Sequence, residues 1–125
     1  MIQTLLTVAL GGALGASGRY LVNITLPRLL GHGFPFATMF VNIVGSFLMG
    51  VLVVVLAEKG GTRAAPFLMT GVLGGFTTFS AFSLDAAKLW EAGQSATAAG
   101  YVLGSVVFAL AALFAGMAFA RGFFA

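Results

Sequence analysis

The chain has 125 residues, 60% of them hydrophobic and only 7% charged, and its mean hydropathy is +1.09. Soluble domains carry about 25% charged residues, so this composition excludes an ordinary soluble domain and predicts an integral membrane protein. The formal charge of +3 rests on six basic residues, too few for a nucleic-acid-binding face, and the absence of cysteine excludes disulfides and thiolate metal sites. A spanning helix needs roughly 20 apolar residues, which leaves room for four or five spans in one membrane domain, residues 1–125.

The first apolar run predicts a span over residues 2–26 that ends before Pro27, because proline disfavours helix at the residue before it. Gly11 and Gly15 share a helix face on which another helix backbone can approach closely. Arg19 continues this face, and an arginine within a span is costly unless it snorkels or finds a partner. Its place near one end fits either snorkelling or a vestibule role in which it attracts anions.

The second span is predicted over residues 36–57 and contains one strongly polar side chain, Asn42. Thr38 and Ser46 lie four residues to either side of it, so the three side chains share a helix face. Asn42 could bind a neighbouring helix, or its amide could be a donor in a pore. The polar stripe favours the pore.

The third span is predicted over residues 64–90, after a polar turn at 58–63, with a break at 75–78. Two adjacent glycines and two adjacent threonines disfavour helix there, and a break at membrane depth survives only where protein or a polar cavity covers it. The expected interruption therefore indicates a functional site in the middle of the membrane.

Just after the break, Phe79 and Phe82 share a helix face, with Thr78 and Ser80 close by. These rings would serve either ordinary packing or a small-ion site, and the adjacent break favours the site. Further on, Asp85 and Lys88 are also three residues apart, so they can pair on one helix face as it nears the interface.

The fourth span is predicted over residues 96–120, and Tyr101 and Ser105 are polar residues on one of its faces. Small residues at four-residue spacing predict two close-packing ridges. These ridges are Gly100–Gly104 and Ala112–Gly116–Ala120.

The basic residues do not define an orientation in the membrane. With four spans, one side holds Lys59, Arg63 and Arg121, and the other holds Arg28, Lys88 and, if it snorkels, Arg19. Cytoplasmic loops normally carry the excess of Lys and Arg, and this chain has no clear excess on either side. The chain is therefore predicted to insert in both orientations and to form an antiparallel, dual-topology homodimer, which supplies the inverted half that no internal repeat provides.

The polar groups of the spans suit an anion better than an enzymatic reaction. The spans lack a central carboxylate, a catalytic triad and a cluster of metal ligands, so the chain is not expected to be an enzyme. The available donors are neutral: the Asn42 amide and the hydroxyls of Thr38, Thr78, Ser80, Tyr101 and Ser105. The positive edges of Phe79 and Phe82 can also face an anion, and unwound carbonyls near Gly74 and Thr77, doubled by a symmetric partner, could hold a small cation.

Three motifs resemble the Fluc (CrcB) family of microbial fluoride channels, and the resemblance extends over essentially the whole chain. They are Gly12-x-x-Gly15-Ala16-x-x-Arg19-Tyr20, then Val41-Asn42-Ile43-Val44-Gly45-Ser46, then Gly74-Gly75-Phe76-Thr77-Thr78-Phe79-Ser80-Ala81-Phe82. The resemblance implies a multi-pass protein of the cell (inner) membrane that passively and selectively exports fluoride and so relieves its toxicity. It implies two pores in an antiparallel dimer.

In each pore the resemblance places the Phe79 and Phe82 edges and the Asn42 amide, with a hydroxyl track at Ser80, Tyr101 and Ser105. A structural sodium ion at the dimer interface would bind the backbone carbonyls of Gly74 and Thr77 from both subunits. The chain departs from the family at Ala81, where the family usually has threonine, so a hydroxyl expected beside the pore is missing.

Two other classes of membrane protein share some of these features. Small multidrug-resistance-type exporters also have four spans and an antiparallel dimer, but they resemble one another in a membrane-embedded glutamate in the first span, and this first span has no acid. An accessory membrane subunit would explain the small-residue faces but not the Phe/Thr break.

Overall fold

The computed structural model describes residues 1–60 and 63–124, the last of these by its backbone only, so positions 61, 62 and 125 of the predicted turn and domain lie outside the described residues. The fold is all-helical. In chain order the elements are α1 (Ile2–Leu30), α2 (Phe36–Lys59), η1 (Pro66–Leu73), α3 (Gly74–Phe76), α4 (Phe79–Glu91) and α5 (Ser95–Phe124). Within this described part, four stretches are long and apolar enough to cross a membrane: Ile2–Leu30, Phe36–Lys59, Pro66–Glu91 and Ser95–Phe123. The predicted all-α fold with four spans is confirmed.

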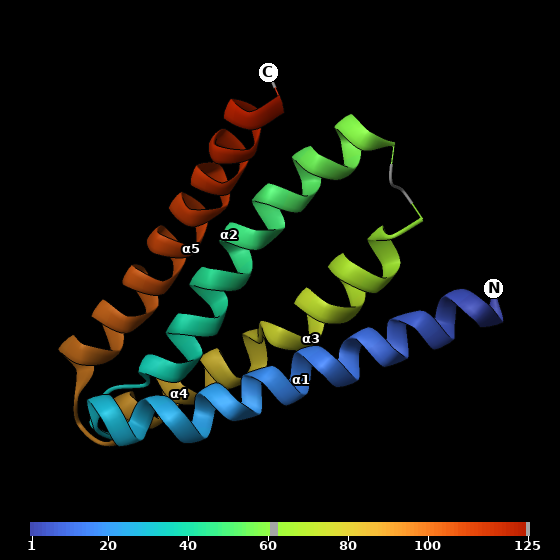
Figure 1. Cartoon of the computed structure of the whole chain (residues 1–125). Helices are drawn as coiled ribbons and strands as arrows, with labels where there is room; N and C mark the ends of the chain where they lie inside the picture. The colour runs from blue at the N-terminus through green and yellow to red at the C-terminus, as the bar shows by residue number, and fades with distance from the viewer. Residues whose placement is uncertain (61–62, 125) are drawn as a thin grey trace.

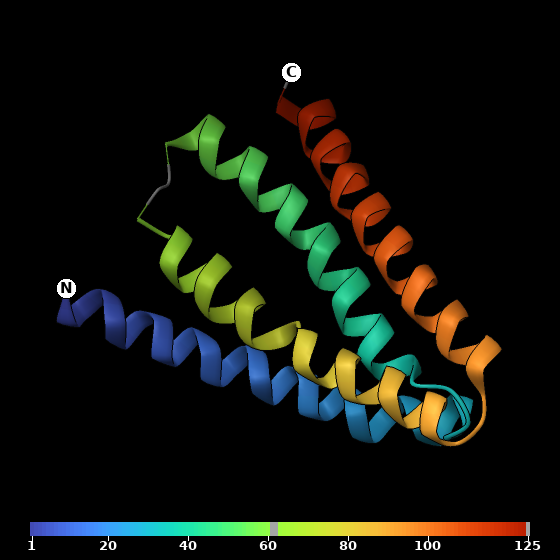
Figure 2. The same cartoon turned by 180° about the vertical axis from the view of Figure 1, so that it is seen from behind.

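The helices form two neighbouring pairs (Figure 1). α2 lies beside α5, and α1 lies beside η1 and α3, while α4 contacts α5. All of them converge at the end that carries the turns at 31–35 and 92–94, and they spread apart towards the end where both termini lie. The view from behind shows the same fan (Figure 2). The break in the third stretch lies where residues of α1, α2 and α4 are close enough to form hydrogen bonds with the groups at the break.

Glycine makes both helix pairs possible. A Cβ atom at Gly11 would lie 2.6 Å from the carbonyl oxygen of Phe67, so α1 can rest on η1 only through bare backbone. In the other pair, Gly116 of α5 lies against the backbone of Phe47 in α2. The predicted packing faces around Gly11 and Gly116 are confirmed. Of the predicted Gly100–Gly104 ridge, Gly104 faces the side chain of Met39 in α2, 3.5 Å from the place that a Cβ atom would take. Gly100 has no atom of another described helix within 4 Å of that place, and this end of α5 packs through the buried ring of Tyr101.

The first helix continues past Pro27 and ends at Leu30, so the predicted end before the proline is wrong. Proline removes only its own N–H group, and its carbonyl still accepts a hydrogen bond of 2.8 Å from the N–H of Gly31. Gly31 ends the helix with a φ of 87°, a conformation that glycine adopts readily.

The third stretch changes its winding along its length. Pro66–Leu73 form a π-helix, a wide turn type that is often found at functional sites. Gly74–Phe76 return to α-helical geometry, and the backbone is then extended at Thr77 (φ −85°, ψ 161°) and Thr78 (φ −156°, ψ 124°). The backbone thus leaves the helix at two residues, fewer than the predicted 75–78, and restarts as α4.

Candidate functional site

Asn42 of α2 holds the extended segment from one side. Its Oδ1 atom accepts a hydrogen bond of 2.8 Å from the N–H of Thr78, and its Nδ2 atom donates one of 3.0 Å to the carbonyl of the same residue. One side chain therefore satisfies both backbone groups of Thr78, as a neighbouring β-strand would. An amide nitrogen carries two protons, so one N–H of Asn42 is not needed for this contact.

At the break, two backbone carbonyls lose the N–H donors that they would have in a continuous helix, because those N–H groups donate to side chains instead. The Thr78 N–H, the helical partner of the Gly74 carbonyl, donates to Asn42 instead. The Ala81 N–H, the helical partner of the Thr77 carbonyl, donates to Thr78 Oγ1 at 3.1 Å. The sequence singled out Gly74 and Thr77 as cation ligands, and theirs are the carbonyls that lose helical donors.

Arg19 occupies the carbonyl that lies between those two. Its Nε atom donates a hydrogen bond of 3.0 Å to the oxygen of Gly75, which Phe79 would bind in a continuous helix. The half-buried side chain thus reaches the break. The Nε atom of Arg19 thus has a protein acceptor, a contact that neither of the two expected roles, snorkelling or attraction of anions, included.

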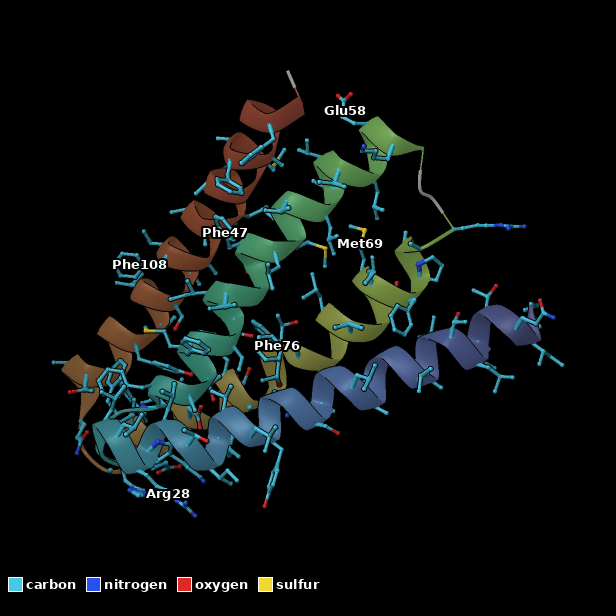
Figure 3. The ribbon with its side chains drawn as sticks, in the orientation of Figure 1. Arg28, Phe47, Glu58, Met69, Phe76 and Phe108 are labelled. Atoms are coloured by element: carbon cyan, nitrogen blue, oxygen red, sulfur yellow. The ribbon has the colours of Figure 1, made fainter. Side chains whose placement is uncertain are left out.

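Phe76 fills the wedge between α1 and α2 next to the break, a role that the sequence analysis missed. Its ring lies within 3.6 Å of the positions that Cβ atoms on Gly18 and Gly45 would occupy. The side chain extends from the third stretch into the space between the two long helices (Figure 3). The only hint in the sequence was the presence of Gly18 and Gly45, one in each neighbouring helix, because glycine leaves room for a ring.

The central pocket opens beside the break and has a volume of about 250 Å³. Four of the expected pore residues come together in it, namely Asn42, Phe79, Phe82 and Ser105, and Thr77, singled out as a cation ligand, lines it as well. The remaining lining comes from Ser46, Thr78, Val106 and Ala109. The rings of Phe79 and Phe82 are 5.5 Å apart at an angle of 45°. Phe82 is buried, whereas Phe79 is 77% exposed, so in a single chain the pocket opens onto the protein surface.

Ser105 gives this pocket its clearest polar feature. The residue is only 5% exposed, and its Oγ atom has no hydrogen-bond partner among the described residues. A buried hydroxyl without a partner is costly, which points to a ligand or a water that fills the pocket. The pocket also lies at the N-terminus of α4, where the first N–H groups have no acceptor within the helix and the helix dipole is positive. A hydroxyl donor, free N–H groups and ring edges suit a small anion.

A second hollow, the end pocket, lies where the helices converge and has a volume of about 490 Å³. Thr38, Ala81, Asp85 and Lys88 are among its lining residues, so the structure places Thr38 here and not in the central pocket. The Asp85 carboxylate accepts a hydrogen bond of 3.2 Å from the hydroxyl of Tyr101. Within the described residues Asp85 makes no ion pair, so the Asp85–Lys88 pair that the helical spacing allows is not formed.

Tyr101 connects the two pockets. Its ring is fully buried and lies 5.2 Å from the ring of Phe82 in the central pocket, while its hydroxyl reaches Asp85 in the end pocket. Ser80 instead lies on the exposed side of the break, 3.2 Å from Thr78 Oγ1. The predicted residues thus divide into a central group, an end group and the Tyr101 ring between them.

Comparison with known proteins gives a consistent result. The profile of the family described as CrcB-like protein, Camphor Resistance (CrcB), matches residues 6–117. The chain is 68% identical to a protein of Cereibacter sphaeroides (strain ATCC 17029 / ATH 2.4.9) named fluoride-specific ion channel FluC, over the whole of both chains. Proteins of the same name from Paracoccus denitrificans (strain Pd 1222) and Ruegeria sp. (strain TM1040) are 60% and 56% identical over 100% and 98% of each chain.

Proposed function

The chain belongs to the CrcB-like protein family, and from this we propose that it is a passive, highly selective fluoride channel. Hydrofluoric acid crosses a membrane as a neutral molecule and ionises inside, so fluoride can then leave through an anion path down its own gradient. Such a path relieves fluoride toxicity without an energy source and without an enzymatic reaction. The observation that carries the proposal is the central pocket, which is lined both by a buried hydroxyl without a partner among the described residues and by the N-terminus of α4.

Fluoride would enter the central pocket and exchange water for protein donors. These are the Ser105 hydroxyl, the remaining N–H of the Asn42 amide, and the edges of Phe79 and Phe82. Several fixed donors in a narrow pocket favour a small anion that forms strong hydrogen bonds over chloride, which is larger. Thr38, Tyr101 and Ser80 would continue the track of hydroxyls away from this pocket.

The working unit would be an antiparallel, dual-topology homodimer in the cell inner membrane, with the break at Thr77–Thr78 in the middle of the bilayer. Two observations support a second copy. Phe79 is 77% exposed in the single chain, and Gly74 at the start of the break is exposed as well. The even distribution of basic residues between the two ends supports insertion in both orientations.

A structural sodium ion would fit at the interface of the two copies. The carbonyls of Gly74 and Thr77 have lost their helical donors to side chains, and carbonyls released at a broken helix are ligands for Na⁺ in membrane transporters. Two such carbonyls from each copy would coordinate the ion without a carboxylate. The bound ion would add a fixed positive charge near the anion path.

The test is fluoride efflux from liposomes that contain the purified protein, measured with a fluoride electrode after addition of a potassium ionophore. Fast efflux of fluoride, with none of chloride under the same conditions, is expected. No fluoride efflux from well-inserted dimer would overturn the proposal and favour an exporter or an accessory subunit. The exporter has less support at present, because Ile2–Leu30 contains no acidic residue that could couple protons.

A further inference from the structure

We propose that Arg19 is a positioning residue that keeps the third stretch broken by occupying the carbonyl of Gly75. The alternative is the role expected from the sequence, in which the positive charge of Arg19 attracts anions. The inference concerns the site of the proposed channel, and so its transport test rests on that function.

The path from Arg19 to the break is short because α1 and the third stretch touch through glycine. A Cβ atom on Gly75 would lie 2.6 Å from the carbonyl oxygen of Gly12, so the two backbones are in direct contact there. Arg19 lies about two turns further along α1, and its half-buried side chain bends back to the oxygen of Gly75. This contact pins Gly75 at a point where the nearest other neighbours are backbone atoms of α1.

The bond decides which groups at the break remain available. In a continuous helix the Gly75 carbonyl would accept the N–H of Phe79, the first residue of α4. While Arg19 holds that carbonyl, the N–H of Phe79 keeps its place at the positive end of α4, beside the central pocket. Removal of Arg19 would leave the Gly75 carbonyl without a donor in an apolar setting. The N–H of Phe79 could then donate to this carbonyl, which would make the helix continuous across the break.

The same contact limits the set of carbonyls open to a cation. Gly75 lies between Gly74 and Thr77, whose oxygens have lost their helical donors. With the Gly75 oxygen engaged, the carbonyls left for a ligand are those two and the carbonyl of Phe76, whose helical donor would be the N–H of Ser80 across the break. Arg19 therefore acts through Gly75 on both the anion pocket and the carbonyl pair, without contact to either ion.

Because the donor is the Nε atom of Arg19, substitutions can remove the positive charge and the hydrogen bond separately. The Nε atom of arginine is the same number of bonds from Cα as the Nε2 atom of glutamine and the terminal carbon of methionine. Arg19→Gln therefore keeps a donor at the required place and removes the charge. Arg19→Met removes both, and Arg19→Lys keeps the charge but places the donor one atom further out.

The experiment compares the three full-length variants with the unaltered protein in liposomes, by fluoride efflux at low and high salt. If Arg19 positions Gly75, Arg19→Gln stays within about threefold of the unaltered protein and exceeds Arg19→Lys, while Arg19→Met falls at least about tenfold, the scale of one lost charge-assisted hydrogen bond. If Arg19 attracts anions, Arg19→Lys exceeds Arg19→Gln and the difference shrinks at high salt, which would overturn the proposal.

Hydrogen–deuterium exchange of the peptide around residues 74–81 gives a readout that does not depend on transport. Changed exchange of this segment in Arg19→Met, with unaltered exchange in Arg19→Gln, is expected. Equal exchange in these two variants would overturn the positioning role. If the unaltered protein carries no fluoride, the proposed function fails, whereas the exchange comparison still decides the role of Arg19.

Discussion

Replacement of Ser105 by alanine tests whether the Ser105 hydroxyl binds a ligand or stabilises the fold. The Ser105 Oγ atom is buried and has no partner among the described residues, so Ser105→Ala breaks no hydrogen bond within the described chain. The free energy of unfolding should therefore stay the same or rise by up to about 1 kcal/mol, because an unsatisfied polar atom is removed. Fluoride in the pocket would lose a hydrogen bond to a charged ligand, worth about 1.5–3 kcal/mol, which corresponds to a fall in efflux of roughly 10- to 150-fold.

The assay combines the rate of fluoride efflux from liposomes with the thermal melting of the purified protein in detergent. Ser83→Ala is the matched control, since the Ser83 hydroxyl donates a 3.0 Å hydrogen bond to the Phe79 carbonyl, is exposed, and does not line the central pocket. It should leave efflux within about twofold, as substitutions at such exposed sites have small effects. Normal efflux through Ser105→Ala would refute the reasoning, and so would a large loss of stability, which would reveal a structural bond.

Three further predictions test the break, the helix contacts and the aromatic pair. Asn42→Leu keeps the side-chain size but removes both hydrogen bonds to Thr78, so the protein should lose about 2–5 kcal/mol of unfolding free energy and melt at a lower temperature; unchanged melting would contradict a stabilising role of these two bonds. Gly15→Ala would place a Cβ atom against the backbone of the third stretch and should abolish assembly, whereas Gly12→Ala, whose new Cβ has no atom of another described helix within 4 Å, should assemble normally; size-exclusion chromatography would detect either failure. Phe79→Ala removes a 77% exposed ring and should abolish fluoride efflux while the proposed dimer still forms, and retained efflux would show that this ring edge is not needed.

Several features of the protein follow from sequence alone, because they depend on local chemistry. Four apolar stretches of sufficient length predicted four spans, and the four-residue spacing of Gly11 and Gly15 predicted a close helix contact. The pairs of glycines and threonines placed the irregular backbone of the third stretch near Thr77. In each case the property lies in the residues themselves or in the helical period.

Other features depend on contacts between residues far apart in the chain, and the sequence left them open. The sequence did not show that Asn42 binds the backbone of Thr78, and Arg19 near the end of a span gave no sign that its donor reaches Gly75. The pairing of Asp85 with Tyr101 displaced the local pair that helical spacing allows.

The physical reason is that a broken helix creates unsatisfied donors and acceptors, and in an apolar setting these must find partners on neighbouring helices. The sequence predicted the break from local preferences. Only the arrangement of α1 and α2 around it decided which side chains satisfy it, and therefore which backbone carbonyls and hydroxyl groups remain free to bind ions.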